Sequence, residues 1–293
     1  MSFLRFLLRM DRRIVFVLVA LAVIAPLIAP LDLPIQITEH ARNLHRAIDQ
    51  IPSGGKPILV SVDYDPSTVP ELEPMTLAVL RHCFRKKVPV IMTTMIPAGA
   101  GLARDAVETV AREFPGSSYG KDYVYMGYKP GGGLVILGIG EDFYGTYPAD
   151  GFGTPTSKLE IIKNVKNYAD IAMMVDFTGS AIYETWIMFA YQKYGCKVGA
   201  GVTAVMASDA YPFLSTGQLV GLLGGLSGAA EYEKLIDAPG DATVGMDAQS
   251  MVHILIIVLI VLGNIAYFAT RRQKQAGQPA GQEEAGGTQH DAC

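Results

Sequence analysis

Two long apolar blocks, one near each end of the chain, constrain its fold more than any other feature of the sequence. The first runs from Ile14 to Leu31 without a charge, and the second covers residues 251–270 around an apolar centre from Ile254 to Ala269. Because an α-helix rises about 1.5 Å per residue, roughly 20 apolar residues cross the hydrocarbon layer of a bilayer. The sequence therefore predicts two transmembrane helices, at 14–31 and 251–270, rather than a soluble cytosolic protein. Glycine, proline or charge breaks every apolar run between them, so a polytopic transporter or channel is not expected.

Charge is distributed unequally around these blocks. Seven bases and four acids lie outside them, in residues 1–13 and 271–293, whereas seventeen bases and twenty-four acids lie between them. Bases close to a span are retained on the cytoplasmic side of a membrane. We therefore expect a two-span protein of the plasma (inner) membrane, with both termini cytoplasmic and residues 32–250 forming an extracytoplasmic domain. The acidic charge of that domain argues against nucleic acid as a partner.

The first block has the features of an uncleaved signal anchor. Its apolar stretch is longer than the core of a usual signal peptide, and a proline follows each small residue, Ala25 and Ala29, at the two candidate cleavage sites. Residues 1–13 are then a basic cytoplasmic segment. Residues 271–293 contain no aromatic residue and almost no aliphatic bulk, so we predict a disordered cytoplasmic tail.

Between the blocks, apolar runs of strand length alternate with amphipathic stretches of helical length. The predicted strands cover 57–62, 88–92, 123–126, 171–175 and 198–202, and the predicted helices cover 75–86, 102–114, 181–194 and 228–236. Strands separated by ten to fifteen helical residues predict parallel βαβ units with helices on both faces of a sheet. We predict an α/β fold, with a doubly wound, mostly parallel, Rossmann-like sheet domain between two transmembrane helices.

Three local features allow more than one interpretation. Within residues 131–145, the apolar run is either an antiparallel strand or a helix that starts at the preceding glycine-rich turn. Cys83 and Cys196 can either pair in an oxidising compartment or remain as buried free thiols. The apolar, glycine-rich segment at 210–226 favours a core strand followed by a tight turn over a third span or an exposed docking surface.

Polar residues follow the predicted strands, where ligands of open parallel sheets bind. The candidate ligand-binding residues are Asp63, Asp65, Thr93, Thr94, Lys129, Gly131, Gly132, Asp176 and Thr178. The acids can hold Mg²⁺, with Asp63 and Asp65 as the metal ligands, and the remaining groups can hold an anion. The alternative is that these residues only cap turns and helices, since chains reach the surface where buried strands end, and then no cofactor is expected.

Residues 62–67, Val-Asp-Tyr-Asp-Pro-Ser, are similar to the nucleophile loop of the haloacid-dehalogenase phosphatases. That family places a nucleophilic Asp and a second, acid–base Asp directly after its first strand, and a Thr or Ser after its second strand. Asp63, Asp65 and Thr93 or Thr94 match these positions in type and place. The resemblance implies a Mg²⁺-dependent hydrolase, but it covers only about ten residues. The proline and serine at 66–67 depart from the family pattern, and no clear late pair of acids follows a strand, which leaves the Mg²⁺ ligation incomplete.

Other standard catalytic motifs are absent from the sequence. It contains no phosphate-binding loop, no nucleophile elbow and no histidine pair with zinc spacing. We therefore expect a non-catalytic ligand-sensing or scaffolding subunit of an envelope complex, with a membrane-bound, phosphatase-like Mg²⁺-dependent hydrolase as the alternative.

The second block also predicts an interface within the lipid bilayer. Gly263 lets another helix approach closely, and the amide of Asn264 needs an interhelical hydrogen bond in lipid. We therefore expect these two residues to contact either a membrane-protein partner or a second copy of the chain.

Overall fold

The structure, a computed structural model, describes residues 11–276 of the 293-residue chain. Residues Pro30–Asp247 form one compact unit, and the chain segments before and after it form a second. The predictions of a basic segment at 1–13 and a disordered tail at 271–293 fall largely outside the described residues.

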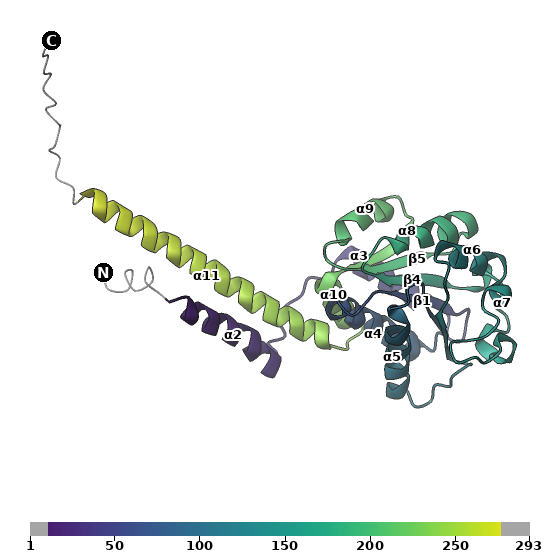
Figure 1. Ribbon diagram of the computed structural model, residues 1–293. Helices are drawn as coiled ribbons and strands as arrows, with labels where there is room; N and C mark the ends of the chain where they lie inside the picture. The colour runs from purple at the N-terminus through teal and green to yellow at the C-terminus, as the bar shows by residue number, and fades with distance from the viewer. Residues whose placement is uncertain (1–10, 277–293) are drawn as a thin grey trace, which may run out of the picture. The chain divides into compact units, whose positions relative to one another are not determined.

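The unit from Pro30 to Asp247 is built on a six-stranded sheet in which every neighbouring pair is parallel (Figure 1). The strand order is β3-β2-β1-β4-β5-β6, so the order reverses between β1 and β4, which we call the switch point. The strands are β1 Ile58–Asp63, β2 Val90–Thr94, β3 Tyr123–Tyr128, β4 Met173–Thr178, β5 Val198–Val202 and β6 Leu219–Gly224. This arrangement confirms the prediction of an α/β, Rossmann-like sheet domain.

Helices cover both faces of the sheet and enclose two apolar clusters. The first face is covered by α3 Glu39–Asp49, α4 Val69–Lys86, α5 Gly99–Glu113 and α10 Gly225–Leu235. The second face is covered by α6 Gly133–Glu141, α7 Phe143–Thr146, α8 Ile182–Trp186, a π-helix at Ile187–Gln192, α9 Ala207–Ser215 and 3-10 turns at Thr156–Lys158, Glu160–Ile162 and Tyr168–Asp170. The predicted helix at 181–194 is therefore two shorter helical segments.

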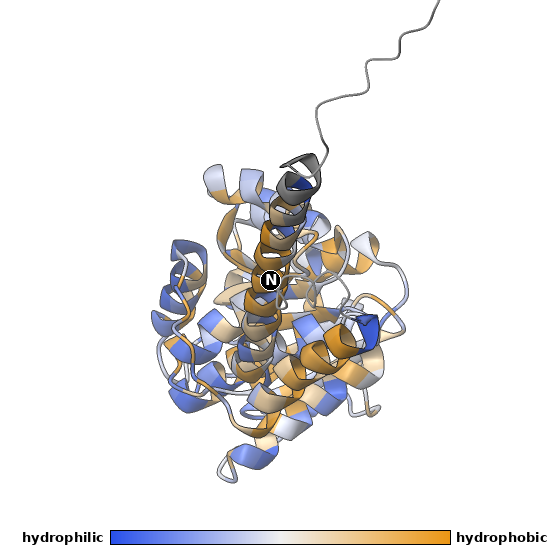
Figure 2. Cartoon of the chain, turned by 90° about the vertical axis from the view of Figure 1, so that its left-hand side faces the viewer, coloured by the Kyte–Doolittle hydropathy of each residue, from blue (hydrophilic) through white to orange (hydrophobic). Residues whose placement is uncertain are grey.

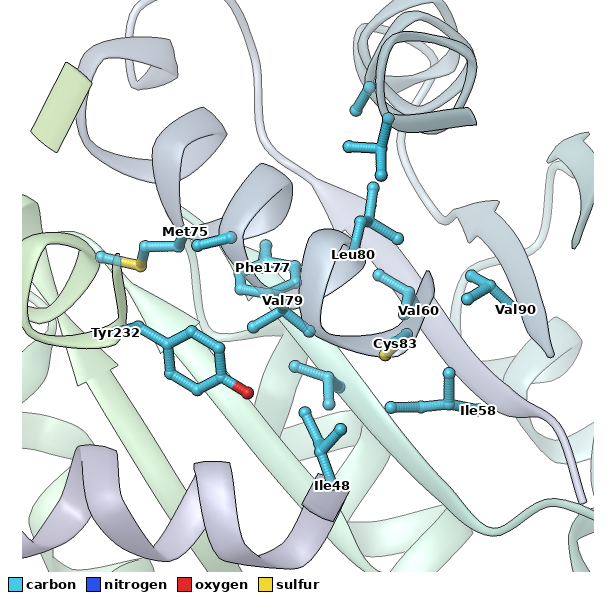
Figure 3. Packing of buried hydrophobic residues seen from close by; sticks show 14 of the residues in the cluster. Ile48, Ile58, Val60, Met75, Val79, Leu80, Cys83, Val90, Phe177 and Tyr232 are labelled. Carbon is cyan, nitrogen blue, oxygen red and sulfur yellow. The ribbon is translucent and has the colours of Figure 1, made fainter. Parts of the chain in front are cut away.

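The two faces of β1 show why its sequence is a continuous apolar run. Ile58, Val60 and Val62 belong to the first cluster, which also contains residues of α4 and α10, while Leu59 belongs to the second cluster. Figure 3 shows Ile58 and Val60 in the first cluster, together with Leu80 and Cys83 of α4. A parallel strand buried on both faces needs apolar residues at consecutive positions. Ser61, which alternates onto the face of Leu59, is therefore a polar residue at a core position.

The ambiguous stretch at 131–145 contains the helices α6 and α7 rather than a strand. Its glycines, which disfavour a helix by propensity, are required by close packing. A Cβ atom on Gly140 would lie 2.2 Å from Cε2 of Tyr194, and one on Gly138 would lie 2.7 Å from Oγ1 of Thr146. Tertiary contacts thus explain a helix that the sequence did not favour over a strand.

Two further helix boundaries differ from the predictions. Helix α4 starts six residues before the predicted position, because Pro70 lies in its first turn, where the missing N–H has no intrahelical partner to lose. Helix α9 was not predicted, since Pro212 and the surrounding apolar residues obscure its period. The strand at 219–224 is confirmed, and Cys83 and Cys196 are buried free thiols.

Among the described helices, α11 (Asp241–Ala276) contains the one segment, residues 241–269, that is long and apolar enough to cross a membrane (Figure 2). This segment includes the second predicted span. The first predicted span corresponds to α2, Arg12–Ile28, a largely exposed apolar helix of 17 residues that ends before Leu31. Among the described helices, one that is long and apolar enough to cross a membrane is thus found for the second block alone, and both spans stay predictions.

Candidate functional site

Two aspartates lie side by side on the strands that flank the switch point. Asp63 ends β1, and Asp176 lies on β4 opposite Ser61, two residues before Asp63. Both are buried, with 2% of Asp63 and none of Asp176 exposed. Strand alternation directs Ser61, Asp63 and Asp176 to the second face, where Trp186 of α8 covers them.

Asp63 accepts hydrogen bonds from four donors. Its Oδ1 accepts from the backbone N–H of Met95 at 2.5 Å and from Oγ1 of Thr94 at 3.3 Å. Its Oδ2 accepts from Oγ of Ser61 at 2.7 Å and, over a longer distance of 3.4 Å, from Nε1 of Trp186. Burial raises the pKa of Asp63, but these donors act in the opposite direction and stabilise the carboxylate.

Asp176 has the opposite environment. Within the described part of the chain, no donor reaches either of its carboxylate oxygens when the group is ionised. Burial, followed by repulsion from Asp63, raises the pKa of Asp176 well above the ordinary value. A proton on Asp176 supplies the missing hydrogen bond, because the resulting acid donates to Asp63. The two carboxyl groups therefore form a carboxylic acid–carboxylate pair that holds one proton and titrates as a unit.

Hydroxyl groups surround this pair on the same edge of the sheet. Oγ1 of Thr93 donates to the carbonyl of Gly127 at 3.2 Å and lies 2.8 Å from the hydroxyl of Tyr147. Oγ1 of Thr178 donates to the carbonyl of Asp63 at 3.1 Å. Burial raises the pKa of the Tyr147 hydroxyl, so it stays a neutral hydrogen-bonding group.

An open cavity of about 340 Å³ lies beside this edge, lined by residues 125–129 and 146–151. We call it the Lys129 cavity, because Lys129 is the one cation in its lining. Nζ of Lys129 donates to the carbonyl of Thr146 and lies 5.7 Å from the ring centroid of Tyr147. The ring of Tyr147 thus lines the cavity, while its hydroxyl contacts Thr93. Tyr147 therefore links the lining of the cavity to Thr93 of β2.

The lining of the Lys129 cavity contains one cation, Lys129, and one carboxylate, that of Asp150. The described ion pairs do not include Lys129. Asp150 also lines the cavity, but Oδ2 accepts from the hydroxyl of Tyr119 at 2.7 Å and Oδ1 accepts from the N–H groups of Phe152 and Thr154. The carboxylate of Asp150 holds its own loop, and the ammonium group of Lys129 is available to an anion.

The structure separates several residues that the sequence grouped together. Asp65 is exposed, and its Oδ1 accepts from the N–H and Oγ of Ser67 at 2.8 and 2.6 Å, which lowers the pKa of Asp65. It caps a turn and does not face Asp63. Gly131 and Gly132, with φ of 131° and 50°, form the turn that starts α6. Across residues 11–276 no group of three His, Cys, Asp or Glu residues is arranged to hold a metal ion.

Sequence reasoning missed the groups that complete the site. Ser61 and Trp186 contact Asp63, and Tyr147 links the lining of the cavity to Thr93. A serine inside an otherwise apolar parallel strand was the one available signal, since such a position needs a polar partner when it is buried. Tyr147 and Trp186 carry no comparable signal, because buried aromatic residues are common in any core.

This edge of the sheet thus combines the accessible ammonium group of Lys129 with the buried carboxyl groups of Asp63 and Asp176. The Lys129 cavity offers an ammonium group to a small anion, whereas Asp63 and Asp176 are buried and Asp63 contacts Trp186. Comparison of the chain with protein-family models, with curated proteins and with solved structures finds no match.

Proposed function

We propose that this protein is a membrane-anchored, non-catalytic ligand-sensing domain that binds a small anion in the Lys129 cavity. The carrying observation is that Lys129 faces this cavity without an anionic partner among the described residues, while Asp63 and Asp176 are sealed from solvent. A cavity of about 340 Å³ falls in the range of small-molecule sites. A lysine beside an aromatic wall supplies charge and orientation for a carboxylate or phosphate group.

The membrane part of the proposal extends the sequence prediction. We propose that α2 and α11 are two spans of the plasma membrane, with both termini cytoplasmic and the α/β domain extracytoplasmic, within an envelope complex. Apolar side chains of both helices are largely exposed, as lipid contact requires. Asn264 is exposed and a Cβ on Gly263 would meet nothing within 4 Å, so this face has room for a partner helix or a second copy of the chain.

A hydrolase is the second candidate, and the acid–carboxylate pair favours it. Two carboxyl groups that share one proton can act as general acid and general base on a water molecule. This reaction requires displacement of Trp186 to admit water and substrate. Asp65, the second acid that the phosphatase resemblance assigned, is exposed and accepts from the N–H and Oγ of Ser67.

Thermal unfolding of the detergent-solubilised full chain, with phosphate, sulfate or citrate against chloride at equal ionic strength, tests the anion site. A ligand that binds only the folded state at 100 times its Kd stabilises it by about 2.7 kcal/mol. We expect at least one of the three anions to raise the Tm of the unmodified chain and of the control Lys163→Met, whose lysine is exposed outside the cavity, but not of Lys129→Met.

Two results would contradict this proposal. An absence of stabilisation by all three anions, or equal stabilisation in Lys129→Met, would remove the anion site. Hydrolysis of a chromogenic phosphate ester that is lost in Asp63→Asn would establish the hydrolase instead.

A further inference from the structure

Four consecutive residues of α10, Glu231 to Lys234, each hold a different part of the domain. We call residues 231–234 the α10 hub. The carboxylate of Glu231 accepts from the N–H and Oγ1 of Thr38 at 2.9 and 2.6 Å, and so fixes the residue that caps α3. The carboxylate of Glu233, 1% exposed, accepts from three backbone N–H groups at the start of α11, those of residues 240, 242 and 243. The hub therefore joins the starts of α3 and α11.

The hub also holds the segment between α2 and α3. Nζ of Lys234 donates to the carbonyl of Leu33 at 3.0 Å and lies 3.3 Å from a carboxylate oxygen of Asp32. Asp247, in the first turns of α11, accepts from the N–H groups of residues 31, 32 and 33 at 2.9 to 3.0 Å. Both segments that leave the domain toward the chain ends are thus fixed by buried or half-buried charged side chains around α10.

The remaining hub residue, Tyr232, contacts a pair of histidines. Its fully buried hydroxyl lies 2.8 Å from Nδ1 of His82 on α4. The ring of His82, 5% exposed, stacks on the ring of His45 from α3, with centroids 4.4 Å apart and planes 16° apart. Tyr232 lies 5.8 and 5.9 Å from these two rings, so α3, α4 and α10 meet at a cluster of three rings.

The charged groups around the rings offer little compensation for added protons. Asp49 of α3 lies 3.8 Å from Nε2 of His82, but it is mostly exposed and already pairs with Lys86 of α4 at 3.0 Å. Lys86 itself disfavours a second cation, and Tyr232 adds no charge. Burial lowers the pKa of His45 and lowers that of His82 to about 4, so both rings are neutral at pH 7.

We propose that the stacked pair of His45 and His82 is an acid-sensitive latch that releases α3, and with it residues 31–38, from α4 and the α10 hub. Two protonated rings at 4.4 Å would place like charges face to face in a mostly buried site. A protonated His82 carries a hydrogen on Nδ1, so the Tyr232 hydroxyl can only accept from that nitrogen and its own hydrogen is left without this partner. Separation of α3 from α4 relieves both conflicts.

The latch goes beyond the proposed anion site, because it shares no residue with the Lys129 cavity. Its target is the segment 31–38, which joins α2 to the domain. Acid would therefore change how the domain is fixed to its first helix. This device would give a membrane-anchored domain a response to extracellular acidity that needs no ligand.

Hydrogen exchange of the full chain in lipid nanodiscs, at pH 7.5 and pH 4.5 with correction for intrinsic rates, tests the latch. If an opened His82 has its ordinary pKa of 6.5 and the closed ring one of about 4, opening becomes favoured by roughly 80-fold at pH 4.5. We expect peptides within 31–50 to lose protection on that order. Peptides from β1 and β4 should stay protected, since acid is not expected to open the sheet there.

Substitutions separate the latch from general acid unfolding. The double variant His45→Gln with His82→Gln keeps polar side chains that do not titrate here, so its 31–50 segment should exchange equally at both pH values. His40→Gln, on the same helix but beside Tyr211, should behave as the unmodified chain does. If the double variant does not fold, the single variant His45→Gln, at a half-buried position, replaces it in the experiment. This variant should lose less protection of residues 31–50 at pH 4.5 than the unmodified chain. Unchanged protection of 31–50 at pH 4.5 in the unmodified chain, or an equal loss in the histidine variants, would overturn the latch.

Discussion

Replacement of Asp176 by asparagine should stabilise the domain, and increasingly so as the pH rises. Asparagine has nearly the shape of the protonated acid, and its amide group can donate to the carboxylate of Asp63 as the acid does. It does not have to hold a proton to make this hydrogen bond. The substitution therefore removes the ionisable group whose oxygens lack donors, while it keeps the partner that Asp63 requires.

The size of the effect follows from proton linkage. Because burial raises the pKa of Asp176 in the folded state, the folded chain binds one proton that the unfolded chain has released above its ordinary pKa of 3.8. The stability contributed by Asp176 is thus fully present below pH 3.8 and declines as the pH rises toward the folded pKa. The decline is about 1.4 kcal/mol per pH unit, so the variant should gain about 2.7 kcal/mol over the unmodified chain between pH 5 and pH 7 while the pair keeps its proton.

The fluorescence of Trp186 provides the assay. It is the one tryptophan of the chain and contacts Asp63, so it reports unfolding of the α/β domain without a signal from α2 or α11. Urea titrations of the solubilised full chain at several pH values give the free energy of unfolding of each variant. The difference between two variants at each pH cancels the contributions of titrating groups outside the Asp63–Asp176 pair, including the histidines.

Asp65→Asn is the matched control, since Asp65 is exposed and its pKa is lowered rather than raised. Its stability relative to the unmodified chain should not increase with pH. If the Asp176→Asn and unmodified curves run parallel from pH 5 to pH 7, the two carboxyl groups do not share a proton, and the account of the buried pair is wrong.

Two further predictions concern packing and assembly. Gly140→Ala should destabilise the domain by about 1–3 kcal/mol in the same urea assay, because the new methyl group would overlap Tyr194, whereas Gly116→Ala, with open space around it, should have little effect. The double substitution Gly263→Leu with Asn264→Leu should weaken self-association, or co-purification of a membrane partner, by a factor of about three to thirty. The fluorescence of Trp186 should not change, because the α/β domain stays folded. Unchanged association would mean that this helix face is no interface.

Local sequence patterns were sufficient for the strands and for the fold class. The run that became β1 is apolar at consecutive positions because both of its faces are buried, and this cause acts within the strand itself. The position of Asp63 and Asp176 after or near the ends of strands was also predictable, because parallel strands end at a common edge. The exposed position of Asp65 was not predictable from the sequence, since one turn of backbone decides whether a side chain faces the core or solvent.

Contacts between distant segments decided the rest. The helix α6 depends on Tyr194 and Thr146 filling the space beside its glycines, and no local propensity contains that information. The shared proton of Asp176 depends on which donors reach Asp63, a property of three strands and α8 together. His45 and His82 are unremarkable in the sequence, and they stack because α3 and α4, thirty-seven residues apart at these positions, pack against the same part of α10. The periodicity of apolar residues identifies the helices and strands. The contacts between side chains of different helices and strands depend on how these elements pack, and a single sequence does not record that packing.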